Sequence, residues 1–213
     1  MNSIVSTVTS IAQFSDDGTK RYLLQKTWDS TKTSLAVIMV CPSSASAVSM
    51  DSTTMLTQNN SERLGYGSVA ILNLFATLND FDLKEAEDED PENLEVIFEC
   101  TKNADAILFC PGVGKNRNKT FLERQRQVLE VLRPMEDKLF CLCDSNGKSR
   151  LQHPLTPSLR TWHLSPLLVS ELIPTDQEPK TAKKEIVPSS TEKKRRGRPA
   201  KESTAPMLNE TVL

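Results

Sequence analysis

The first residues that could do chemistry follow a predicted buried strand. The apolar run 34–40 reads SLAVIMV, and its continuous, β-branched character predicts a central strand. The chain then continues as CPSSASA, a cysteine and a proline followed by small residues. Loops at the carboxyl ends of strands carry the ligand sites of α/β proteins. This stretch is therefore a candidate site loop, and Cys41 is its candidate nucleophile.

Two interpretations of Cys41 stay open. A loop of small residues can lower the pKa of a thiol, and His153 across the site would then act as its base. Alternatively, the side chain packs as a small apolar group. Four of the five cysteines, which stand at 41, 100, 110, 141 and 143, lie in or beside apolar runs, which favours the second interpretation.

Further polar residues follow the other predicted strands, 68–75, 104–110 and 138–144. Because parallel strands end at one edge of a sheet, we expect these residues to form one ligand site. The loop PGVGKNRNK offers cations for phosphate, although a solvated loop leading into a helix explains it as well. It lacks the residues of a Walker loop. The gathered residues are Ser43, Ser44, Asp51, Asn73, Asn79, Asp80, Lys115, Arg117, Asn118 and His153.

The order of elements predicts an α/β fold. Helical patterns at 52–65, 91–103 and 119–133 alternate with the four apolar strands. This alternation predicts a three-layer sandwich around a central, mainly parallel four-stranded sheet. Residues Ile4–Phe14 and Lys20–Trp28 read as a hairpin at its edge, and 158–173 as a short closing helix.

The composition changes near Pro174. Residues 174–213 are rich in Pro, Thr, Ser, Lys and Glu and show no apolar periodicity. We therefore expect an α/β domain over 1–173 and a disordered basic tail over 174–213. The whole chain carries a net charge of −2, whereas the tail holds nine Lys and Arg against six Asp and Glu.

The tail contains the segment KKRRGRPAK at 193–201, which resembles an AT-hook. Gly197 allows close approach to the minor groove, Pro199 keeps the chain extended, and the cations suit a narrow groove of negative potential. The segment predicts contact with DNA or RNA, although a basic tail that meets acidic partners explains it too. The expected nucleic-acid contacts are Lys193, Lys194, Arg195, Arg196, Arg198 and Lys201.

Other classes of protein receive no support. The odd number of cysteines and the lack of a secretory signal predict a reduced, cytoplasmic protein. No apolar run approaches the roughly 20 residues of a membrane span. The absence of CxxC and HExxH patterns predicts neither a metal site nor a cofactor. The oligomeric state is not indicated.

Several segments together resemble a family of uncharacterised bacterial and phage proteins, domain of unknown function 1643. The resemblance covers about Arg21 to Leu155, through RYLLQKTW, VIMVCPSSASAVSMDSTT, LGYGSVAILNLFATLNDFDL, ADAILFCPGVG and GKSRLQHPL. The family has Asn-Pro-Ser where this chain has Cys41-Pro42-Ser43, and Trp-Gly where it has Cys110-Pro111.

The layout of that family is in turn similar to the uracil-DNA glycosylase superfamily. The resemblance implies that Cys41-Pro42-Ser43 matches the loop that positions the attacking water, that Asn73 and Phe75 hold the base, and that His153-Pro154-Leu155 closes on it. A thiol at position 41 lacks the oxygen that orients water, which leaves hydrolysis in doubt. Asp51 is the candidate substitute.

These observations predict a nucleic-acid-binding protein with a glycosylase-like base or nucleotide pocket and a DNA-contacting tail. One alternative is a thiol-dependent enzyme that uses Cys41 and His153. Another is a non-catalytic phage or plasmid protein whose pocket sequesters a nucleotide or a host factor.

Overall fold

The computed structural model describes residues 1–43, 45–78, 90–112, 118–143, 146–147 and 151–173. All of these residues belong to one compact unit, Met1–Asp176. The predicted tail 174–213 with its segment 193–201 lies outside the described residues, as do Lys115 and Arg117.

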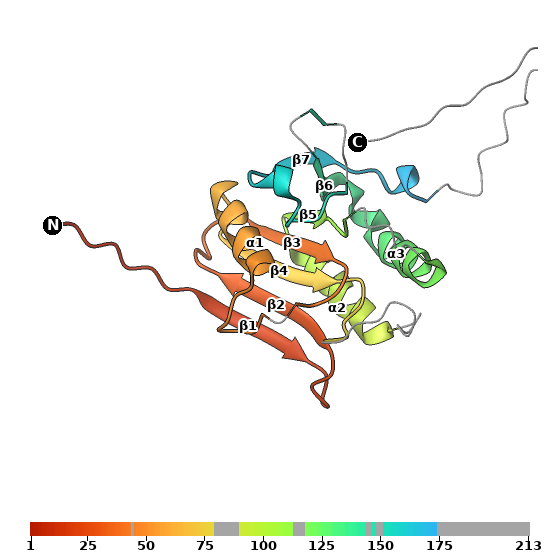
Figure 1. The fold of residues 1–213 in the computed structure, drawn as a ribbon, viewed down its shortest axis with the longest axis horizontal. Helices are drawn as coiled ribbons and strands as arrows, with labels where there is room; N and C mark the ends of the chain where they lie inside the picture. Colours follow the sequence, from red (N-terminus) through yellow and green to blue (C-terminus); the bar gives the residue numbers. More distant parts are fainter. Residues whose placement is uncertain (44, 79–89, 113–117, 144–145, 148–150, 174–213) are drawn as a thin grey trace, which may run out of the picture. The chain divides into compact units, whose positions relative to one another are not determined.

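One seven-stranded mixed sheet forms the centre of the molecule, in the order β1-β2-β4-β3-β5-β6-β7 (Figure 1). Strands β4, β3, β5 and β6 run parallel to one another, β2 pairs antiparallel with β1 and β4, and β7 pairs antiparallel with β6. The strands are β1 (Thr9–Phe14), β2 (Arg21–Thr27), β3 (Ser34–Met39), β4 (Ser68–Asn73), β5 (Ala106–Phe109), β6 (Leu139–Cys143) and β7 (His163–Pro166).

The expected N-terminal edge hairpin is confirmed as β1 and β2, whereas the expected mainly parallel four-stranded sheet is wrong, because the sheet has seven strands and is mixed. The four apolar runs do form the parallel centre, but β7 adds a strand where a closing helix was expected. The sequence HLSP has no apolar alternation and ends in proline, so nothing in its pattern indicates a strand. An edge strand tolerates a proline because its outer side needs no ladder partner.

Helices lie on both faces of the sheet, which gives three layers. Residues of α2 and α3 join the apolar cluster on one face, with Ile97, Phe121 and Leu129 fully or nearly buried. Helix α1 and the segment around Trp162 cover the other face. The helices are α1 (Ser52–Arg63), α2 (Pro91–Asn103) and α3 (Lys119–Leu132), with short 3-10 helices at Arg133–Lys138, Pro157–Leu159 and Val169–Glu171.

A polar side chain caps the start of each of the three α-helices. Asp51, Asp90 and Asn118 each accept a hydrogen bond from a backbone N–H in the first turn of α1, α2 and α3 respectively. Such caps satisfy donors that the helix itself leaves open. The cap of α1, Asp51, is also a residue of the candidate site.

Helix α1 is attached to the body mainly through polar groups. Its buried residues are Thr54, Thr57, Asn60 and Ser61, and none of them is apolar. The Asn60 amide donates to the Arg160 carbonyl over 3.2 Å and accepts from the Trp162 N–H over 3.1 Å. Among the described helices, none is long and apolar enough to cross a membrane.

Candidate functional site

Arg21, the first residue of β2, lies buried beneath the loop that follows β3. Its side chain is 1% exposed and donates to the Ser43 carbonyl over 3.3 Å and to the Ala45 carbonyl. The β1–β2 register shifts at Gln13/Phe14, which leaves Tyr22 without a partner in β1. This irregularity lets Arg21 reach the loop while Tyr22 reaches Glu92 of α2. Sequence reasoning missed Arg21, although the family resemblance begins there.

Asp51 is the carboxylate of the candidate site. It accepts from the Thr54 N–H over 2.7 Å. Burial by itself would raise the pKa of Asp51, but hydrogen bonds from Ser43 and Thr54, together with the charge of Arg21, lower it below its usual value. Burial lowers the pKa of Arg21 and Asp51 opposes that shift. The structure thus brings the predicted residues Ser43 and Asp51 together around a buried cation.

His153 joins this group from the loop after β6. Burial lowers the pKa of its imidazole, and the charge of Asp51 partly offsets that effect. Its Nδ1 accepts the Leu155 N–H over 3.1 Å, which assigns the proton of the neutral ring to Nε2. Gly112 packs against it: a Cβ there would lie 3.1 Å from the His153 Cβ, and the glycine has a φ of +84°. The close approach and the positive φ both favour glycine, which has no Cβ, at this position.

Cys41 has surroundings that favour a thiol rather than a thiolate. The side chain is half-buried, and burial raises its pKa. The neighbouring Pro42 is buried. The roles of Cys41 as nucleophile and of Pro42 in substrate binding stay predictions, and the raised pKa does not favour the first.

Asn73 ends β4 and is the least satisfied polar side chain at this edge. It is 1% exposed, and neither its amide oxygen nor its amide nitrogen has a hydrogen-bond partner among the described residues. Val69 and Ile71, two and four residues earlier in β4, belong to the cluster on the α1 face. Because side chains alternate along a strand, Asn73 points to that face too.

Phe75 does not lie in the same pocket as Asn73. It is 4% exposed and belongs to the apolar cluster beneath α2 and α3, on the opposite face of the sheet. The alternation of β4 ends at Asn73, so the two side chains separate where the chain leaves the strand. The predicted stacking of a base on Phe75 would require the ring to leave this core.

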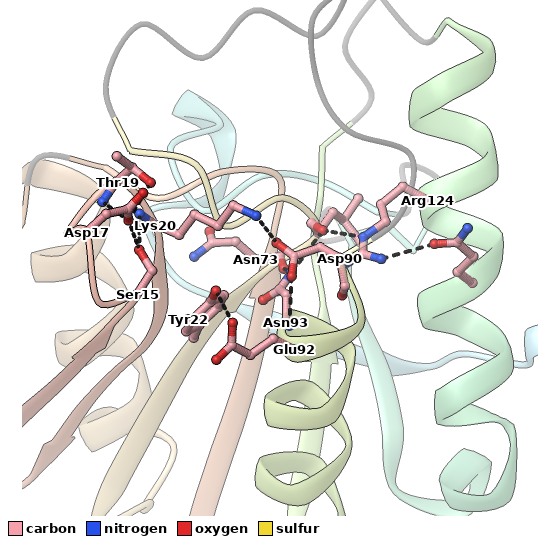
Figure 2. A network of polar contacts seen from close by, with 12 residues as sticks. Ser15, Asp17, Thr19, Lys20, Tyr22, Asn73, Asp90, Glu92, Asn93 and Arg124 are labelled. Carbon is pink, nitrogen blue, oxygen red and sulfur yellow. Dashed lines mark hydrogen bonds and ion pairs between the residues drawn. The ribbon is translucent and has the colours of Figure 1, made fainter.

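A second polar network, which no sequence pattern predicted, holds the loop after β4 (Figure 2). Arg124 of α3 is fully buried and donates to the Leu74 carbonyl over 2.7 Å and to the Asp90 carbonyl over 3.2 Å. Asn93 of α2 donates to the Asn73 and Leu74 carbonyls over 3.0 and 3.1 Å.

The rim of this network carries an ion pair between Lys20 and Asp90, with 3.2 Å between Nζ and Oδ2. Beside it, the Tyr22 hydroxyl donates to Glu92 over 2.6 Å. Burial, with the nearby carboxylates, raises the pKa of Tyr22. Among the described residues, no three His, Cys, Asp or Glu side chains are grouped as metal ligands.

Comparison with known proteins identifies the family. Residues 21–155 match the family described as protein of unknown function, DUF1643. The chain belongs to this family. The matched range of the DUF1643 protein contains Arg21, Asp51, Asn73 and His153. No curated protein and no solved structure matches the chain, so no structural neighbour supports the likeness to uracil-DNA glycosylases.

The buried position of Arg21 predicts a large loss of stability on its removal. Arg21→Met leaves two loop carbonyls unpaired and takes the cation from Asp51, so we expect the free energy of unfolding to fall by about 3 to 5 kcal/mol. Arg126→Met is the matched control, because Arg126 is exposed and pairs with Glu123 on its own helix. Urea unfolding of both variants measures the difference. Equal midpoints would show that Arg21 does not hold the loop.

The lowered pKa of His153 predicts a pH-dependent stability. The unfolded chain binds a proton at this residue near pH 6.5, whereas the folded protein binds it only at lower pH. The free energy of unfolding should therefore fall as pH decreases from 6.5 toward the folded pKa. His153→Gln should flatten this decrease and His163→Gln should keep it, as measured by urea midpoints between pH 5 and 7.5. The same slope in both variants would contradict the assignment.

Proposed function

We propose that this DUF1643 protein binds a nucleotide or an exposed nucleic-acid base at the carboxyl edge of its parallel strands and contacts DNA through the basic segment 193–201. The binding site consists of Asn73, Arg21, Ser43, Asp51 and His153. The likeness of layout to uracil-DNA glycosylases suggests the class of ligand, and the chemistry of the site supports it independently.

The unsatisfied amide of Asn73 carries the proposal. A buried polar group without a partner costs about 1 to 3 kcal/mol, so proteins rarely keep one without a use. A carboxamide presents a donor and an acceptor side by side, which matches the polar edge of a base. Asn73 is 1% exposed, so binding requires the covering loops to open.

Two hydrogen-bond donors on the same side of the sheet as Asn73 suit a polar ligand. Arg21 is held at the base of the loop after β3, and its Nε has no hydrogen-bond partner among the described residues. His153 is held neutral by burial, so its Nε2–H is a donor at neutral pH. These two donors complement ligand oxygens on the same side of the sheet as Asn73.

Base hydrolysis is the second candidate function. The lowered pKa of Asp51 keeps it a carboxylate at neutral pH, and it lies close enough to His153 to influence its pKa. A carboxylate can orient an attacking water, which the thiol of Cys41 cannot do. The alternative of a thiol enzyme has less support, because burial raises the pKa of Cys41. Sequestration of a nucleotide without chemistry needs only the binding site.

Replacement of Asn73 separates ligand binding from stability. Asn73→Leu removes an unsatisfied amide at similar volume, so we expect the free energy of unfolding to stay equal or to rise, while binding of single-stranded DNA and free nucleotides is lost. The control is Asn93→Leu, which breaks two hydrogen bonds and should destabilise the protein by about 1 to 3 kcal/mol. Fluorescence anisotropy and urea unfolding give the two readouts. If Asn73→Leu still binds single-stranded DNA and nucleotides, Asn73 is not part of the binding site.

DNA binding by the basic segment 193–201 can be tested separately from the pocket. Arg196→Ser with Arg198→Ser should weaken binding to A·T-rich duplex and lower the slope of log affinity against log salt by about 2, because each cation contributes about one released counterion. Lys180→Ser with Lys183→Ser removes equal charge outside the hook-like segment and should have a smaller effect on A·T preference. Titrations at two salt concentrations with A·T-rich and mixed duplexes test this. If both double substitutions change the preference for A·T-rich duplex equally, the segment 193–201 acts only as a nonspecific basic tail.

A further inference from the structure

Strand β1 leaves one edge of the sheet open. It pairs with β2 and, in the described part of the chain, with no strand on its other side. Residues 1–8 continue from β1 past the end of β2 and make no strand pairing of their own (Figure 1). Fully extended, they would reach about 27 Å beyond the sheet. An open backbone edge of this length is a template for pairing with another strand.

This edge lacks the features that normally prevent such pairing. The sequence MNSIVSTVTSIAQF, residues 1–14, contains no charged side chain and no proline, and is rich in β-branched residues. Its apolar side chains face solvent: Ile4 is 96% exposed, Val5 91%, and Val8, Ile11 and Phe14 about half. An uncharged, β-prone segment with exposed apolar side chains is more consistent with a surface that a partner covers than with one that stays in water.

The opposite edge of the same sheet shows the usual protection. Strand β7 has four residues, ends in Pro166 and begins with His163. Both shortness and proline limit edge pairing. The contrast between the two edges within one sheet indicates that β1 is left open for a partner.

We propose that the partner is a second copy of this chain, and that residues 1–14 of the two copies pair antiparallel about a two-fold axis. A segment without charge pairs with itself without repulsion, and it offers no charge to select an acidic or basic partner peptide. A two-fold contact of this kind closes on itself and leaves no new edge. The two seven-stranded sheets then form one continuous sheet.

The faces of the sheet restrict the register. Ser10 and Ala12 lie opposite Lys26 and Leu24 and face the α1 side, whereas Ile11 and Gln13 lie opposite Gln25 and Leu23 and face the α2 side. A two-fold axis perpendicular to the sheet keeps each face on its own side, so residues opposite one another must both be odd-numbered or both even-numbered.

One allowed register uses the whole segment. With Val8 on the two-fold axis, Val5 of each copy lies opposite Ile11 of the other, and Ile4 lies opposite Ala12. Residues 1–7 of each copy thereby cover the open edge of the other copy's β1. This register pairs Val8 with Val8 and Val5 with Ile11, places Phe14 opposite Asn2, and leaves none of the segment unpaired.

The test is the mass of the full-length protein in solution. We expect light scattering after size exclusion to give twice the chain mass of 23.8 kDa, with a concentration-dependent dissociation. Val8→Lys places two ammonium groups opposite one another and should shift the protein to monomer, by at least tenfold in dissociation constant. Val8 precedes β1, so the variant does not disturb pairing with β2. Val48→Lys, at an equally apolar and more exposed position, should leave the dimer unchanged.

A cysteine at the axis tests the register. Side chains directly opposite in an antiparallel pair have Cβ atoms about 5 Å apart, so Val8→Cys should form an intermolecular disulfide under mild oxidation, whereas Val48→Cys should not. A monomer at all concentrations, or a dimer equally stable in Val8→Lys, would overturn the proposal. A dimer that Val8→Lys weakens without a disulfide in Val8→Cys would overturn the register alone.

Discussion

Two buried guanidinium groups hold the loops at the carboxyl edge of the sheet. Arg21 binds carbonyls of the loop after β3, and Arg124 binds carbonyls of the loop after β4 and of Asp90. Loss of either guanidinium would leave buried backbone carbonyls of its loop without a hydrogen-bond donor, so each holds its loop in place. Asp51 and Asn73 take their positions from these loops. The geometry of the candidate site therefore depends on these two buried cations, of which Arg21 is itself part of the site.

The sequence predicted the centre of the fold because the central strands are nearly uniform in burial. Residues 35–39 of β3 are all buried, and a continuous apolar run is the pattern such a strand produces. The pattern fails for β7, whose exposed and half-buried residues carry no alternation. Its pairing with β6 is a tertiary contact that short-range patterns do not contain.

The candidate site was predictable in part for the same reason. Ser43, Asp51 and His153 could be grouped because they follow strands that end at one edge, and the structure brings them together. The buried positions of Arg21 and Arg124 could not be predicted, because an arginine in a strand or helix usually lies in solvent. Phe75 was placed with Asn73 on resemblance, but the change of face after β4 depends on backbone geometry that the residue types do not reveal.

Helix α1 differs from α2 and α3 in how it adheres to the sheet. Its buried side chains are hydroxyls and an amide, whereas the other two helices bury apolar side chains such as Ile97, Val128 and Leu129. Hydrogen bonds can be exchanged for water at small net cost, but exposed apolar area cannot. The face under α1 is itself apolar, with Val37, Val69 and Ile71 fully or nearly buried, so its cover depends on Leu159 and Trp162 as well as on α1. One sheet is thus closed in two ways, by helices with apolar inner faces on the α2 and α3 side, and by a polar helix together with Leu159 and Trp162 on the side of Asn73.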